Sequence, residues 1–152
     1  TGVRTFEAAA YLKRCGAEVT RVRKMLRNDM DAYKARAEVV RHAEVYRGAF
    51  AISICPADKI ESPTIVGAQA ADELLNIVGI KASFVLTEYQ GKIYVSSRSI
   101  DEINVQKIME RLGGGGHLNM AGCQLRDCTV SQAQRIIEDT IDEMLEEGDI
   151  EE

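Results

Sequence analysis

The chain contains the run Gly113-Gly114-Gly115-Gly116-His117, which is its most informative stretch. Four consecutive glycines lose more conformational entropy on folding than any other four residues, so bare backbone at this place must have a use. One use is close approach by a phosphate, held by backbone N–H groups and contacted by the His117 side chain. The alternatives are a flexible linker and an ordinary glycine cap at the end of a helix.

A polar cluster, Ser96-Ser97-Arg98-Ser99, precedes the glycines at the end of an alternating stretch, 92–95, that is typical of a strand. Three hydroxyls around one guanidinium predict an anion clamp, because the fork of Arg98 matches two phosphate oxygens. The alternative is a solvated strand end. Asn104 is expected to cap a short helix over 105–112 that leads directly into the glycines.

These residues, in this order, resemble the DHHA1 domain of the DHH phosphoesterases. The resemblance rests on the polar cluster at 96–99, Asn104-Val105, the glycine run with His117, and Ala121-Gly122. The opening ten residues, TGVRTFEAAA, resemble the closing segment of a preceding DHH domain. Within the family the chain is most similar to the membrane-anchored bacterial cyclic-di-AMP phosphodiesterases.

The resemblance implies the substrate-binding part of a manganese-dependent phosphodiesterase that hydrolyses cyclic-di-AMP or a similar dinucleotide. Two Mn²⁺ ions would be held by a DHH domain whose motifs this sequence lacks, so neither a catalytic residue nor a metal ligand is expected here. This piece alone is therefore expected to be inactive. The substrate-binding residues that the resemblance implies are Ser97, Arg98, Ser99, Asn104, Gly114, Gly115, Gly116 and His117.

Two other functions remain open: a lobe of a DHH-family single-strand exonuclease or oligoribonuclease, and an RNA-binding module like the C-terminal domain of alanyl-tRNA synthetase. The formal net charge of −5 argues against a general nucleic-acid binder, and no long nucleic acid is expected as a partner. The expected partners are a cyclic or linear dinucleotide and the protein's own DHH domain. A homodimer is left open.

The order of expected elements predicts an α/β fold, a layered domain with a central mixed β-sheet flanked by helices. A long connector helix would precede it, with apolar residues at three- and four-residue spacing over 20–45. Other helices are expected at 8–14, from Ser62-Pro63 toward Gly79, and after a capping box at Ser131. The expected strands are 49–55, 82–87, 92–97 and 121–125, with a hairpin turn at 89–91.

The resulting domain organisation has four parts. Residues 1–19 would be the C-terminal remnant of a DHH domain, 20–47 the connector helix, 48–146 the DHHA1 domain, and 147–152 an acidic tail that frays. The chain begins at Thr1 rather than Met and is expected to be a piece of a larger protein.

Charge and cysteine content add three expectations. The eight basic residues of 21–47, against four acidic ones, either face an anionic partner or form a solvated helix face. No apolar stretch approaches 18 residues, so this piece itself is not expected to cross a membrane. The resemblance implies that it is a cytoplasmic domain of a membrane-anchored parent. The cysteines show no metal-ligand spacing and are expected to be idle thiols; they are Cys15, Cys55, Cys123 and Cys128.

Overall fold

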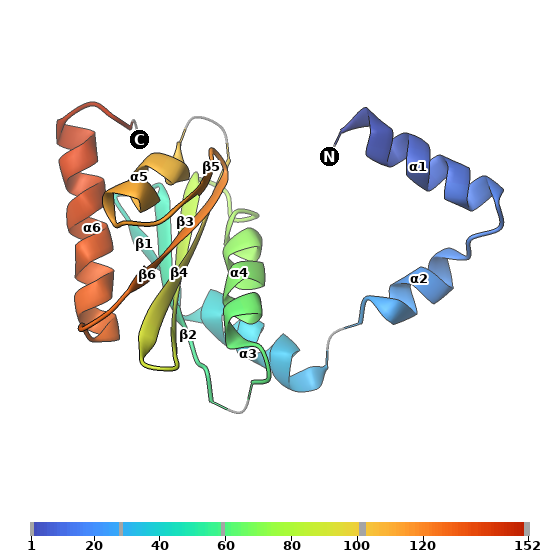
Figure 1. The fold of residues 1–152 in the computed structure, drawn as a ribbon, viewed down its shortest axis with the longest axis horizontal. Coiled ribbons are helices and arrows are strands. Elements are labelled where there is room, and N and C mark those ends of the chain that lie inside the picture. The colour runs from blue at the N-terminus through green and yellow to red at the C-terminus, as the bar shows by residue number, and fades with distance from the viewer. Residues whose placement is uncertain (1, 28, 59, 101–102, 151–152) are drawn as a thin grey trace.

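The computed structural model describes residues 2–27, 29–58, 60–100 and 103–150. A six-stranded sheet with the order β1-β2-β3-β4-β6-β5 forms its centre (Figure 1). The sheet is mixed, because β2 and β3 run parallel while the other neighbours are antiparallel. The strands are β1 (Glu44–Tyr46), β2 (Phe50–Cys55), β3 (Ala82–Tyr89), β4 (Lys92–Ser99), β5 (Gly115–His117) and β6 (Met120–Leu125).

Helices cover both faces of the sheet, which confirms the predicted α/β class. The helices are α1 (Val3–Arg14), α2 (Val19–Met25), α3 (Met30–Arg41), α4 (Pro63–Leu74), α5 (Val105–Arg111) and α6 (Val130–Glu146). One core joins Phe84 of β3 to α5 and α6, and the other joins Val85, the next residue of β3, to α3 and α4. Successive side chains of a strand point to opposite faces, so β3 is buried on both sides.

On the face that carries α3 and α4, the helices leave the outer strands exposed. Tyr94, Ser96 and Arg98 of β4 are only partly buried, and Met120 and Gln124 of β6 are exposed. The part of this face formed by β4, β6 and β5 is called the open face below. In Figure 1, β4 and β6 lie between α6 and α4.

Helices α1 and α2 extend away from the sheet as an arm (Figure 1). Neither helix buries a residue against the part of the chain that the structure describes. Apolar side chains on the arm are exposed, among them Phe6 at 67% and Leu26 at 75%. Within the described ranges, no helix is both long enough and apolar enough to cross a membrane.

The single connector helix predicted over 20–47 is wrong. Helix α2 ends at Met25, and α3 starts again with Asp29 as its N-cap, whose carboxylate accepts a hydrogen bond from the Ala32 N–H at 2.9 Å. Helix α2 ends with Leu26 as its C-cap, and the Asp29 cap starts a separate helix although the apolar spacing continues. Helix α3 is then no free connector, because Val39 is fully buried in the core.

Strand β1 lies where the end of that helix was predicted. Its residues pair with β2, for example Val45 with Ala51, so sheet pairing overrides the local helical pattern. The sheet domain accordingly contains α3 and β1, and it begins well before residue 48. Of the eight basic residues of 21–47, three form ion pairs within the part of the chain that the structure describes: Arg36 with Glu73, Arg41 with Glu38 and Arg47 with Asp142.

The acidic tail does not fray over 147–150. Gly148 adopts a φ of +74° and turns the chain back, and Ile150 is 5% exposed in the core. Arg111 of α5 binds Glu147 and Asp149, which ties the tail to the domain. Residues 151–152 of the predicted tail, like Thr1, lie outside the described residues.

Of the remaining local predictions, the helix from Ser62-Pro63 toward Gly79 is wrong at its end, because α4 stops at Leu74 with Leu75 as its C-cap. The hairpin turns through Gln90 and Gly91, with φ values of +52° and +72°, and Asn104 caps α5. The capping box before α6 is formed by Thr129 and Gln132 instead of starting at Ser131. Because Thr129 and Ser131 are each followed by Gln three residues later, the sequence permits either register.

Candidate functional site

The register of the outer strands places the chemically distinctive side chains in rows. Arg98 of β4 lies opposite Met120 of β6, and Met120 lies opposite His117 of β5. Residues directly opposite each other in antiparallel strands point to the same face. Arg98 and His117 therefore share the open face, separated by two strand spacings, or roughly 10 Å. One ligand of nucleotide size can reach both.

The next row of the open face is almost bare. Ser96 of β4 lies opposite Gly122 of β6, which lies opposite Gly115 of β5. Two neighbouring strands thus present backbone without side chains at the same level. We call Gly122 and Gly115 the glycine strip. It forms a shallow floor beside the row of Arg98 and His117.

The structure makes different demands on the four glycines of the run. Gly113, with a φ of +75°, ends α5 in a Schellman motif: its N–H binds the Glu110 carbonyl, and the Gly114 N–H binds the Met109 carbonyl. The helix-cap alternative is therefore correct for Gly113. It accounts only for the first glycine.

Gly114 and Gly116 are required by strand packing. A Cβ on Gly114 would collide with the Gly122 carbonyl oxygen, and one on Gly116 would collide with the Met120 carbonyl oxygen. At Gly115 a Cβ would meet no atom of the described residues within 4 Å, and its backbone does not have a positive φ. Among the described residues, the packing therefore gives no reason for glycine at 115.

The guanidinium of Arg98 is held in place. Its Nε donates to Oδ1 of Asp72 on α4 at 2.8 Å, and Nη1 donates to the Ser97 carbonyl at 2.9 Å. The side chain is only 12% exposed. A guanidinium has five N–H donors, so two bonds fix its orientation and leave donors for an anion.

The other hydroxyls of the predicted clamp point to the opposite face of β4. Ser97 Oγ donates to the Ala121 carbonyl at 2.8 Å, and Ser99 Oγ donates to the Leu118 carbonyl at 3.3 Å. Asn104 accepts hydrogen bonds from two N–H groups of α5. Ser97, Ser99 and Asn104 thus make hydrogen bonds within the fold. Ser96, and not Ser97 or Ser99, lies on the open face. The predicted role of Ser97, Ser99 and Asn104 in substrate binding remains a prediction.

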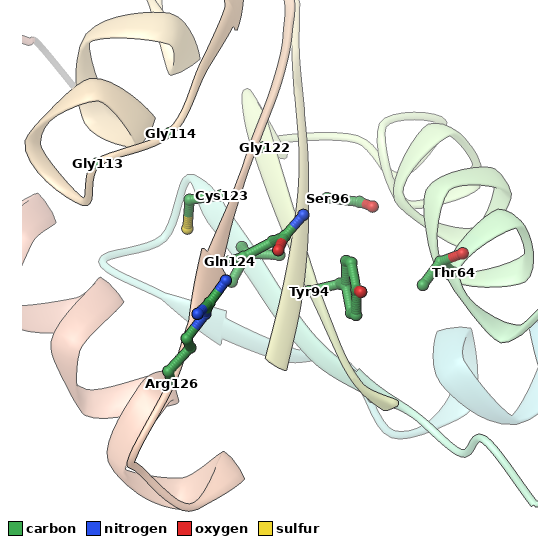
Figure 2. Close-up of a pocket in the computed structure, with 10 residues that line it drawn as sticks. Thr64, Tyr94, Ser96, Gly113, Gly114, Gly122, Cys123, Gln124 and Arg126 are labelled. Atoms are coloured by element: carbon green, nitrogen blue, oxygen red, sulfur yellow. The ribbon is translucent and has the colours of Figure 1, made fainter. Parts of the chain in front are cut away.

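A hollow of about 500 Å³ adjoins the glycine strip (Figure 2). Its floor includes Tyr94 and Gln124, which lie directly opposite each other on β4 and β6. Thr64 of α4 and Arg126 stand at its edges, and Gly113 and Gly114 border it from the α5 side. The sequence analysis missed these polar residues. Strand alternation from Ser96 and Gly122 would have identified Tyr94 and Gln124.

Two observations limit the chemistry of this site. Burial raises the pKa of the Cys123 thiol to about 11, so this residue of the hollow is neutral at physiological pH and a poor nucleophile. Among the described residues, no three His, Cys, Asp or Glu side chains gather closely enough to hold a metal ion. The arrangement is suited to binding and orienting an anionic ligand.

Comparison with known proteins agrees with this geometry. The model of the DHHA1 domain family matches residues 49–147. The chain is 43% identical over 143 residues to the cyclic-di-AMP phosphodiesterase PdeA of Listeria monocytogenes, covering 93% of this chain and 22% of that protein. It is 41% identical over 150 residues to the cyclic-di-AMP phosphodiesterase GdpP of Bacillus subtilis, covering 97% and 23%. The chain thus spans less than a quarter of these relatives.

A solved structure shares the fold along nearly the whole chain. The exopolyphosphatase-related protein of Bacteroides fragilis superposes with a TM-score of 0.82 at 19% identity, over 95% of this chain and 44% of that one. Since 95% of the chain is covered, the shared fold includes much of the α1–α2 arm as well as the sheet. The match of the family model, the glycine run and the fold together show that this chain belongs to the DHHA1 domain family.

Proposed function

We propose that this chain is the dinucleotide-binding part of a phosphodiesterase that hydrolyses cyclic-di-AMP. The observation that carries the proposal is the glycine strip beside the shared row of Arg98 and His117. The identity of 41–43% to two cyclic-di-AMP phosphodiesterases supports the choice of substrate. Linear dinucleotides present the same phosphates and remain candidates for the same site.

In this proposal each residue of the open face has a separate task. Arg98, fixed by Asp72, donates charge-assisted hydrogen bonds to a phosphate. His117 is exposed on the edge strand β5, beyond β6, and contacts the same phosphate or the next one. Gly115 leaves room for the ligand to lie against the backbone. These contacts hold the phosphodiester in a fixed orientation, which lowers the entropic part of the barrier.

The hydrolytic chemistry itself is assigned to a DHH domain. Two Mn²⁺ ions bound there would activate water and stabilise the leaving oxygen. The described residues of this chain do not fit such a metal centre, so their contribution is binding and orientation.

The exposed arm supports an attached DHH domain. Contiguous apolar surface on a soluble protein marks an interaction site, and α1 and α2 expose Phe6, Leu12, Met25 and Leu26. We assign residues 1–19 to the end of that domain, which would pack on these side chains. A membrane anchor upstream of the DHH domain and a homodimer belong to the same proposal.

Titration calorimetry of this chain with cyclic-di-AMP tests the proposal. We expect Arg98→Ala to weaken binding by about tenfold or more, the value of a charge-assisted phosphate contact. Arg135→Ala is the matched control, because Arg135 is exposed on α6 at the other face of the sheet. Equal affinities of wild type and Arg98→Ala would contradict the assignment of the open face.

A further inference from the structure

The hollow between the glycine strip, Tyr94 and Gln124 has no task in the phosphate contacts described above. We propose that it is a purine-base pocket in which the side-chain amide of Gln124 selects adenine. This inference rests on the proposed function, because it assumes that a phosphate of the same ligand lies at Arg98. It identifies the adenine base as the part of the ligand that is recognised and Gln124 as the residue that selects it.

The spacing of the rows fits a single nucleotide. Arg98 and Tyr94 are four residues apart on β4 and point to the same face, so their rows lie about 13 Å apart along the strand. The Ser96 row, with the glycine strip, lies between them. A phosphate at Arg98 thus places a ribose over bare backbone and a base near Tyr94 and Gln124.

The lining of the hollow has the chemistry of a base pocket. Figure 2 shows the Tyr94 ring between β4 and Thr64 of α4, and Arg126 extending along β6 toward Gln124. An aromatic ring and a guanidinium plane are the two side-chain surfaces on which nucleobases stack. The bare backbone of Gly122 leaves the floor flat enough for a planar ring.

Gln124 is the one amide side chain that lines the hollow among the described residues. Its Oε1 accepts a hydrogen bond from Lys92 Nζ at 3.4 Å, which orients the amide. A carbonyl oxygen has a second lone pair, so Oε1 can still accept from the exocyclic amine of adenine while Nε2 donates to adenine N7. This bidentate pairing is the usual one between glutamine and adenine.

A carboxylate at this position would reverse the preference. Glu at 124 has no donor for adenine N7, but its two oxygens accept from guanine N1–H and the exocyclic N2 amine. Gln124→Glu nearly conserves size and shape, so the change tests hydrogen-bond recognition separately from packing. Gln132→Glu, on α6 at the other face of the sheet, makes the same change of charge and is the matched control, because a Glu oxygen can still accept the hydrogen bond from the Thr129 N–H.

The experiment is an NMR titration of this chain with three probes: adenosine 5′-monophosphate, guanosine 5′-monophosphate and ribose 5-phosphate. We expect wild type to bind the adenine nucleotide about tenfold more tightly than ribose 5-phosphate, as stacking and one bidentate pair allow. Gln124→Glu should weaken binding of the adenine nucleotide by about tenfold and make the guanine nucleotide the tighter ligand. Its affinity for ribose 5-phosphate should be unchanged. Gln132→Glu should behave like wild type, and thermal melting checks that each variant is folded.

The outcomes separate the pocket from the phosphate site. Equal affinities for the adenine nucleotide and ribose 5-phosphate, unaltered by Gln124→Glu, would overturn the base pocket and leave the phosphate site in place. A protein that binds none of the three probes would overturn the proposed function and the pocket together. A shift of preference toward guanine in Gln124→Glu alone would support the assignment of Gln124 as the specificity residue.

Discussion

Asp72 on α4 and Arg98 on β4 form an ion pair in which Nε and Oδ1 lie 2.8 Å apart. Arg98 is 12% exposed and Asp72 is 58% exposed, so the acid reaches over the arginine from the solvent side. The second bond, from Nη1 to the Ser97 carbonyl, leaves the guanidinium little freedom. The guanidinium of Arg98 is therefore oriented in the free protein, which would reduce the entropic cost of binding the phosphate of the proposed substrate.

The first prediction follows from this orientation. Asp72→Ala should weaken cyclic-di-AMP binding by about three- to tenfold, the cost of immobilising one flexible side chain. Asp72→Asn keeps an oxygen acceptor and should lose less. Calorimetric titration measures both, with Asp139→Ala on α6 as the control. Tighter binding by Asp72→Ala would show that Asp72 competes with phosphate instead of orienting Arg98.

The second prediction concerns the glycine run. Gly114→Ala and Gly116→Ala push a Cβ into the backbone of β6, and each should lower the melting temperature by about 3–10 °C. Gly115→Ala meets no such contact and should melt like wild type, but it should weaken cyclic-di-AMP binding by about tenfold. A Gly115→Ala protein with unchanged melting and unchanged affinity would remove the glycine strip from the site.

The third prediction is that this chain alone does not hydrolyse cyclic-di-AMP when Mn²⁺ is added. The described residues offer no cluster of metal ligands, and the open face supplies binding groups only. The assay is product formation by the purified chain, followed by chromatography. Turnover near the ~10 s⁻¹ of a typical enzyme would place the catalytic machinery within these residues.

The fourth prediction concerns the thiols. Burial raises the pKa of both Cys55 and Cys123 to about 11. At pH 8 a thiol reagent should therefore modify exposed Cys15 quickly and these two slowly.

The same shift makes stability depend on alkaline pH. In the unfolded chain these thiols ionise at their ordinary pKa near 9, while in the folded chain they stay protonated until about 11. The folded state thus holds more protons over this range, and the free energy of unfolding should fall as the pH rises from about 9. Denaturant melts at pH 8 and 10 measure the fall, and Cys55→Ala with Cys123→Ala should reduce it.

Local sequence signals predicted most of the sheet. The hairpin, α4 after Pro63, the cap at Asn104 and the strand before Leu125 all follow from residues that act within their own neighbourhood. Predictions failed where distant segments decide the structure. Strand β1 exists because β2 pairs with it, and the segment from Glu147 to Ile150 is fixed by the core and by Arg111.

The candidate site likewise divides into residues that local sequence reveals and residues that only distant contacts place there. The glycine run and Arg98 could be recognised from sequence, because their residue types are distinctive. The partner of Arg98 could not, since Asp72 lies 26 residues away on another element. The family resemblance implies Ser97 and Ser99 as binding residues beside Arg98, but the alternation of the strand turns their side chains to the other face. Ser96, Tyr94 and Gln124 required the register of β4 and β6.

The most direct test of the central claim is an amide NMR titration of this chain with cyclic-di-AMP. The account predicts that the largest shifts fall on the open face, at Ser96, Arg98, Gly115, His117 and Gly122, and that they disappear in Arg98→Ala. Shifts confined to α5 and α6 on the opposite face, or no shifts at all with millimolar ligand, would contradict the claim that the glycine strip and Arg98 form the dinucleotide site.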